Sequence, residues 1–141
     1  MEHYEKFCCA VDLLVEANEQ FRERFRDQKW YDAFGPVTYA AERATVQVNP
    51  NRQAGKTEYI KSRAKAGDLI VVHAREFIHS YVDCGTEAEV RMVSELRADE
   101  SRYNKIYIDE PWLVFQNVSR GKFYSSLCKD ADQTFIFLGR N

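Results

Sequence analysis

The sequence predicts an α/β domain built on a mainly parallel sheet of four to five strands, with helices on both faces and a helix at the N-terminus. Short apolar runs of β-forming residues alternate with segments of helical periodicity, which is typical of βαβ units. Right-handed crossovers in such units place helices on both faces of the sheet, which gives three layers. The length of 141 residues suits one such core and excludes a second full domain.

Residues 1–43 form the predicted helical N-terminal segment. Apolar side chains recur at steps of three, four or seven from residue 4 to about residue 26, which predicts one amphipathic helix. Asn18 lies on the same stripe, so the helix either pairs with another chain, as in a coiled coil, or packs on its own sheet, and the second arrangement is favoured. A Gly-Pro pair ends this helical region, and a shorter helix is expected over residues 37–42.

Residues 44–141 form the predicted core, in which we expect four strands. They cover residues 44–48, 69–72, 105–108 and 134–138. A helix is expected over residues 56–65, after the first strand. Thr86 and Glu89 form a capping-box pattern, which predicts a further helix to about residue 98. Residues 112–127 are predicted to be helical with a break near Gly121.

Charge and composition exclude several classes of protein. With 20 Lys and Arg against 22 Asp and Glu, the chain has no overall basic field for non-specific nucleic-acid binding. The longest aliphatic run covers residues 69–72, which is too short to cross a bilayer. The acidic and mixed first residues are not typical of a secretory signal. We therefore expect a cytoplasmic protein that has no membrane partner.

The cysteines predict neither a disulfide framework nor a structural zinc site. Two of the four, Cys8 and Cys9, are adjacent, and no C-x-x-C pair occurs. His73, His79 and Cys84 carry ligand atoms, but their spacing matches no zinc pattern. Reduced thiols, mostly packed in the interior, are the favoured interpretation.

A Gly-Lys-Thr triplet stands at the start of the helix predicted after the first core strand. Each residue type suits phosphate binding: Gly55 lets the backbone turn close to an anion, Lys56 is a mobile positive charge, and Thr57 offers a hydroxyl to Mg²⁺. The segment from Pro50 to Thr57 resembles the phosphate-binding loop of P-loop NTPases. Because Pro50 replaces the first Gly of that motif, the loop is similar to the variant in terminases and some helicases, where an Arg-Gln pair precedes Gly-Lys-Thr.

The resemblance implies a loop whose backbone N–H groups and helix N-terminus cradle the phosphates of a nucleotide. The nucleotide-binding residues are then Asn51, Arg52, Gln53, Ala54, Gly55, Lys56 and Thr57. Lys56 reaches the outer phosphates, and ATP with Mg²⁺ is the implied ligand.

Two adjacent carboxylates follow the apolar strand predicted over residues 105–108. With them the strand resembles a Walker B motif, which implies that Asp109 supports Mg²⁺ and that Glu110 polarises the attacking water. Asp109 lies 53 positions after Lys56, with a strand and a helix expected between them, as the fold requires. The chain is thus identified as a member of the P-loop NTPase superfamily, in the division with a catalytic Glu after the Walker B Asp, with Lys56 and Glu110 in catalytic roles.

In that division the last strand lies between the two strands that carry the motifs, so that its carboxyl end points at the γ-phosphate. The resemblance makes Arg140 or Asn141 a candidate sensor of the γ-phosphate, and the alternative is a frayed chain end without a role. No internal arginine finger is evident. Arg120 and Arg140 are therefore the candidates for completing the site of a second copy.

Three functions remain open from the sequence. The favoured one is a small Mg²⁺-dependent ATPase, completed by self-association or by a protein partner. A nucleoside kinase similar to thymidine kinases would use Glu110 to deprotonate a nucleoside hydroxyl. A nucleotide-binding module without turnover would regulate a nucleic-acid machine or a host factor. By analogy, such a compact core is expected in a phage-encoded protein that acts in the host cytoplasm.

A nucleic-acid partner would need a local binding patch. The candidates are Lys61, Arg63 and Lys65 on one helix face, and Trp30, Tyr31 and Phe34 in the aromatic run. Cations can follow a phosphate backbone and aromatic rings can stack on bases. A solvated helix face and an ordinary core cluster are the favoured interpretations.

Overall fold

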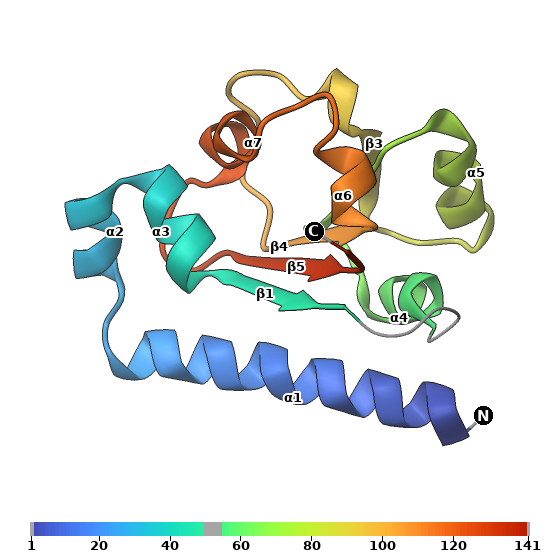
Figure 1. The fold of residues 1–141 in the computed structure, drawn as a ribbon, viewed down its shortest axis with the longest axis horizontal. Helices are drawn as coiled ribbons and strands as arrows, with labels where there is room; N and C mark the ends of the chain where they lie inside the picture. The colour runs from blue at the N-terminus through green and yellow to red at the C-terminus, as the bar shows by residue number, and fades with distance from the viewer. Residues whose placement is uncertain (1, 50–54, 141) are drawn as a thin grey trace.

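The computed structural model describes residues 2–49 and 55–140, and its centre is a five-stranded sheet in the order β1-β5-β4-β2-β3 (Figure 1). The strands are β1 (Thr45–Val48), β2 (Leu69–Val72), β3 (Glu89–Met92), β4 (Lys105–Asp109) and β5 (Thr134–Leu138). Every neighbouring pair is parallel. The predicted α/β fold with a parallel sheet and an N-terminal helix is confirmed, as is the place of the last strand between β1 and β4.

Helices cover both faces of this sheet and make a three-layer arrangement (Figure 1). They are α1 (Glu2–Arg24), α2 (Gln28–Phe34), α3 (Pro36–Arg43), α4 (Lys56–Arg63), α5 (Arg75–Asp83), α6 (Pro111–Val114) and α7 (Arg120–Leu127), with a 3₁₀ helix, η1, at Val93–Glu95. Side chains from α3, α6 and α7 share one buried cluster, and side chains from α1, α4 and α5 share the other. None of the helices in the described part is long and apolar enough to cross a membrane.

Strand β5 lies in the middle of the core and contributes to both clusters. All five of its residues are buried. Phe135 and Phe137 point into the cluster of α3 and α7, whereas Ile136 and Leu138 point into the cluster of α1 and α4. A near-continuous apolar run is what a parallel strand covered on both faces requires.

Helix α1 packs on the sheet of its own chain, as the favoured arrangement predicts. Its buried residues include Phe7 and Val11. Asn18 donates a hydrogen bond to the carbonyl of Arg43 (2.9 Å) and accepts one from Arg22 (2.9 Å), so this polar residue is satisfied within the fold. The opposite face of α1 leaves apolar side chains exposed, including Leu14.

The predicted helix over residues 86–98 is wrong, because the chain forms β3 and η1 there. The Thr86 hydroxyl accepts a hydrogen bond from the N–H of Ala88 (3.2 Å), which closes a short turn instead of capping a helix. The N–H of Glu89 instead donates to the carbonyl of Asp68 (3.1 Å), and the following residues pair with β2. Pairing with a buried parallel strand therefore overrides the local capping pattern.

Two further differences concern helices. Helix α5 occupies a stretch for which the sequence predicts no element. The helical region predicted over 112–127 is divided into α6 and α7, but the break lies before Ser119 and not near Gly121. Ser119 caps α7 by accepting a hydrogen bond from the N–H of Lys122 (3.1 Å), which places Gly121 inside the first turn.

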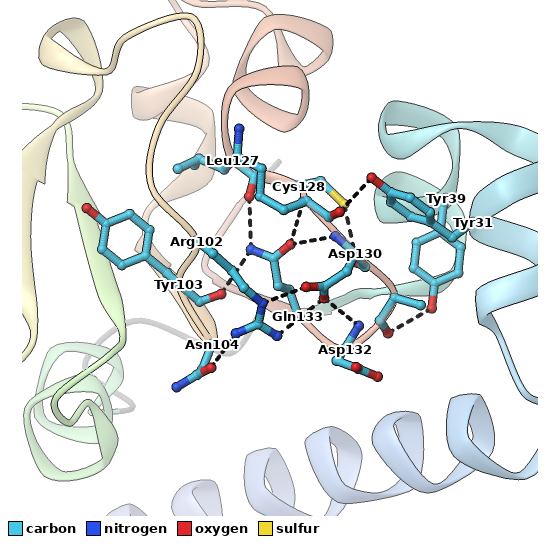
Figure 2. Close-up of polar contacts among 12 residues, drawn as sticks. Tyr31, Tyr39, Arg102, Tyr103, Asn104, Leu127, Cys128, Asp130, Asp132 and Gln133 are labelled. Atoms are coloured by element: carbon cyan, nitrogen blue, oxygen red, sulfur yellow. Dashed lines mark hydrogen bonds and ion pairs between the residues drawn. The ribbon is translucent and has the colours of Figure 1, made fainter.

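The turn before β5 is organised by Gln133, as Figure 2 shows. This fully buried side chain accepts hydrogen bonds from the N–H groups of Lys129 (2.6 Å) and Asp130 (3.2 Å). Its amide donates to the carbonyls of Tyr103 and Leu127, each at 2.9 Å. All four contacts of one amide fix the amino end of β5, opposite the end at which the predicted motifs lie.

The four cysteines are free thiols, and Cys8 and Cys128 are buried. Burial raises the pKa of the Cys128 thiol to about 11. Cys9 and Cys84 are exposed.

Candidate functional site

The candidate site lies where three neighbouring parallel strands end together. Val48 at the end of β1 pairs with Leu138 of β5, and Leu138 pairs on its other side with Asp109 of β4. Helix α4 begins at Lys56, after the loop that follows β1. Carboxyl ends of parallel strands form the usual ligand-binding edge of α/β sheets, so the register brings both predicted motifs to this edge.

The side chains of the two motifs are in direct contact. The hydroxyl of Thr57 donates a hydrogen bond to Oδ2 of Asp109, and the ammonium group of Lys56 forms an ion pair with Oε1 of Glu110. Both members of the ion pair are only partly exposed, with 17% and 28% of their side-chain surface accessible. A lysine, a hydroxyl and two carboxylates thus form one partly buried polar cluster.

Gly55 is required by its conformation and by a close neighbour. Its φ of +96° lies in the left-handed region, and its carbonyl accepts the N–H of Tyr59 (2.8 Å) as α4 begins. A β-carbon at this position would lie 2.5 Å from Cδ1 of Tyr4, a residue of α1. The first turns of α1 therefore contact the start of the helix that carries Lys56 and Thr57.

Glu110 also has an unusual backbone. Its φ of 60° places it in the left-handed region, which is uncommon for a residue other than glycine. The N–H of Glu110 donates to the carbonyl of Leu138 (2.8 Å), and Glu110 precedes the first turn of α6. A β-carbon at Gly139 would lie 2.8 Å from Oε2 of Glu110, so the end of β5 leaves room for this carboxylate only because residue 139 is glycine.

The neighbours of Asp109 shift the pKa of its carboxyl group in opposite directions. Burial, the largest influence, raises the pKa of its carboxyl group above the ordinary value. The Thr57 hydrogen bond and the positive charge of Lys56 lower this pKa, while the charge of Glu110 raises it. A partly buried carboxylate that is costly to ionise gains from any cation placed beside it.

The donor atoms suit Mg²⁺. A hydroxyl and a carboxylate, from Thr57 and Asp109, provide the oxygen ligands that this hard cation prefers. Among the described residues no group of three or more His, Cys, Asp or Glu side chains is placed to hold a metal ion. Mg²⁺ usually takes one or two protein ligands and completes its shell with water and substrate phosphates, so the residues present fit a metal that arrives with a nucleotide.

Sequence reasoning missed two residues at this edge, Tyr81 and Gly139. The Tyr81 hydroxyl lies 3.5 Å from Oδ2 of Asp109, and Gly139 lies against Glu110. Neither belongs to a local motif, and Tyr81 comes from a helix that the sequence did not predict. Gly139 follows the last predicted strand, and its position after a strand end was the one available signal.

Several predicted site residues are not tested. Asn51, Arg52, Gln53, Ala54 and Asn141 lie outside the described residues. Their predicted roles in nucleotide binding and sensing therefore stay predictions, as does the effect of Pro50.

The two arginines proposed as sensor or finger pack on aromatic rings. The guanidinium of Arg140 lies 4.6 Å from the centre of the Trp112 ring. The backbone carbonyl of Arg140 accepts a hydrogen bond from the N–H of Trp112 (2.9 Å). Arg140 is thus held beside the first turn of α6, one residue beyond the glycine that touches Glu110. Arg120 lies over the ring of Phe115 (4.4 Å).

The two groups of residues predicted as nucleic-acid patches do not form a free binding surface beside the site. Arg63 pairs with Asp12 through three hydrogen bonds of 2.8, 3.0 and 3.3 Å, which neutralises part of the basic face of α4. Trp30 and Phe34 stack on each other (5.5 Å between ring centres) on α2. Because α2 and α3 precede the amino end of β1, this aromatic pair lies near the amino ends of the strands, whereas α4 begins near their carboxyl ends (Figure 1). It is not positioned to stack on a nucleotide at the site.

No protein-family model matches this chain, and a search of curated proteins finds no similar sequence. The function must therefore be inferred from the sequence motifs and the geometry of the site.

Proposed function

We propose that this protein binds ATP together with Mg²⁺ at the site of Lys56, Thr57, Asp109 and Glu110, and that it hydrolyses the nucleotide. One observation carries the proposal: two motifs 53 positions apart in the sequence meet side chain to side chain at the carboxyl end of a parallel sheet. This is the arrangement that phosphoryl transfer with a metal-bound nucleotide requires.

Each side chain has a role that its chemistry supports. Lys56 neutralises the outer phosphates, and Thr57 and Asp109 hold the metal ion. A bound Mg²⁺ would stabilise the negative charge that develops on the phosphate oxygens. Glu110 orients a water molecule and accepts its proton.

The ion pair between Lys56 and Glu110 bears directly on this mechanism. A phosphate that takes Lys56 as its partner competes with Glu110 for the ammonium group. Nucleotide binding therefore frees the Glu110 carboxylate for its role as the base, and the free protein keeps both groups neutralised.

The test is ATP turnover by purified protein, with and without DNA or RNA, together with its mass in solution. Glu110→Gln should lower turnover by about 100-fold or more, since general base catalysis alone contributes that much. Lys56→Ala should lower it by a similar factor, because it removes the positive charge that faces the phosphates. Lys65→Ala and Glu58→Gln are matched controls, because both residues are exposed and lie outside the cluster. If Lys56→Ala or Glu110→Gln turns over ATP at the unaltered rate, the proposal is wrong.

Binding without turnover is the second candidate, and it requires that the Lys56–Glu110 ion pair persists when the nucleotide is bound, because Glu110 held by lysine does not orient water. Tight ATP binding with negligible hydrolysis, even with DNA or RNA present, would support this function over the first. Labelled ATP supplied with nucleosides tests the kinase alternative, which requires a phosphorylated nucleoside as the product.

A further inference from the structure

Asp109 has a second hydroxyl neighbour besides Thr57. The phenol oxygen of Tyr81 lies 3.5 Å from Oδ2 of Asp109, which is the same oxygen that accepts the Thr57 hydroxyl. Tyr81 is only 1% exposed. A buried hydroxyl requires a hydrogen-bond partner, and this carboxylate supplies it.

The fold holds Tyr81 in place from several sides. Tyr81 belongs to α5, which follows β2, and β2 is the neighbour of β4 in the sheet. The N–H and the thiol of Cys84 both donate to the carbonyl of Tyr81, at 3.3 and 3.0 Å. The ammonium group of Lys61, on α4, lies 5.9 Å from the centre of the Tyr81 ring. The ring is thus enclosed between α4, α5 and the sheet.

We propose that Tyr81 is a positioning residue for the metal ligand Asp109, an inference that rests on the proposed function. Two hydroxyls, one from α4 and one from α5, donate to Oδ2 and so fix the rotation of the carboxyl group. Oδ1 of Asp109 accepts neither of these two hydrogen bonds and is the oxygen presented to a cation. Helix α5 thereby becomes part of the metal site although it carries no ligand.

The test uses Tyr81→Phe, which removes the hydroxyl and keeps the ring. Binding of a fluorescent ATP analogue is titrated with Mg²⁺, and binding without metal is measured in EDTA. The variant should need about threefold to tenfold more Mg²⁺ for half-maximal binding, the effect of one long hydrogen bond to a charged group. Affinity in EDTA and turnover at saturating Mg²⁺ should be unchanged, because Lys56 and Glu110 are intact.

Tyr124→Phe is the matched control. Tyr124 is also buried, but it lies on α7 and its hydroxyl contacts Thr45 (2.7 Å) on the other face of the sheet. A purely structural role of Tyr81 would lower the free energy of unfolding without moving the Mg²⁺ midpoint. Coincident Mg²⁺ titrations of Tyr81→Phe, Tyr124→Phe and the unaltered protein would overturn the inference while leaving the proposed function intact. Failure of the unaltered protein to bind ATP would instead overturn the proposed function itself.

Discussion

Asp109 shows how its surroundings shift the pKa of a single carboxyl group. Its carboxyl group is partly buried at a strand end, and this desolvation raises its pKa more than its hydrogen-bond partners lower it. In the metal-free protein the ionised carboxylate therefore opposes folding. A positive charge beside it would remove this cost.

We predict that Asp109→Asn increases the free energy of unfolding of the metal-free protein near neutral pH. The side chain keeps its shape, and its oxygen can still accept the Thr57 hydroxyl. Because the folded pKa is raised, the cost of ionising Asp109 is full above that pKa and disappears as the pH falls below the ordinary value of an aspartate. Urea unfolding in EDTA at a series of pH values measures the difference, which should shrink in acid. A variant less stable than the unaltered protein at neutral pH would contradict this account.

At the scale of elements, β3 and η1 are held by a buried carboxylate in the loop that follows them. The Glu100 side chain is fully buried and accepts hydrogen bonds from the guanidinium of Arg91, on β3, and from the N–H of Arg97 (2.6 Å). Burial by itself would raise the pKa of Glu100, but these contacts lower it to about 2. An edge strand whose residues are all exposed or only partly buried is thus fastened by charge-assisted hydrogen bonds.

Glu100→Gln should therefore destabilise the protein by roughly 2 to 3 kcal/mol at neutral pH. The contribution of Glu100 is complete above the pKa of an unfolded glutamate and is lost as the pH falls toward its folded pKa of about 2, because protonation weakens both contacts. Denaturant unfolding at pH 7 and pH 3 should show a smaller difference between variant and unaltered protein in acid. Glu95→Gln, an exposed position on η1, serves as the control and should change stability by less than about 0.5 kcal/mol.

The elements that could be predicted from the sequence are those with a strong apolar pattern. Strands β2 and β5 are nearly continuous apolar runs, and α1 has a clear helical period. Strand β3 has only partly buried or exposed residues, so its pattern is weak and the Thr86–Glu89 spacing was more prominent. At the site, the four central residues were predictable because each motif is local in sequence. Tyr81 and Gly139 were not, because their importance comes only from contacts across the fold.

At the scale of the whole molecule, α1 is joined to the distant turn before β5 by one buried arginine. Arg22 is 4% exposed, and its guanidinium donates to the carbonyls of Ala131 (2.8 Å) and Gln133 (2.9 Å) and to the hydroxyl of Thr134. These partners lie more than 100 positions away along the chain. One side chain thus connects the N-terminal helix to the start of β5.

Arg22→Leu should lower the free energy of unfolding by about 3 to 5 kcal/mol, because it removes three charge-assisted hydrogen bonds and leaves the Gln133 carbonyl without this donor, while the Ala131 carbonyl keeps only the Tyr39 hydroxyl. Arg24→Leu, two positions along the same helix and exposed, should change it by less than about 0.5 kcal/mol. Chemical denaturation of both variants provides the comparison. Equal stabilities of the two variants would show that the contact between α1 and the start of β5 contributes nothing to stability.

The contact between Tyr4 and Gly55 has a practical consequence for the experiments above. Tyr4 lies close to the first residue of the chain, and Arg140, whose carbonyl binds the N–H of Trp112, lies close to the last. Both ends of the described chain therefore reach the neighbourhood of the candidate site. Extra residues placed directly before Tyr4 or after Arg140 stand beside the start of α4 or beside Glu110 and compete with a nucleotide for this space, so affinities should be measured on protein from which every tag has been cleaved.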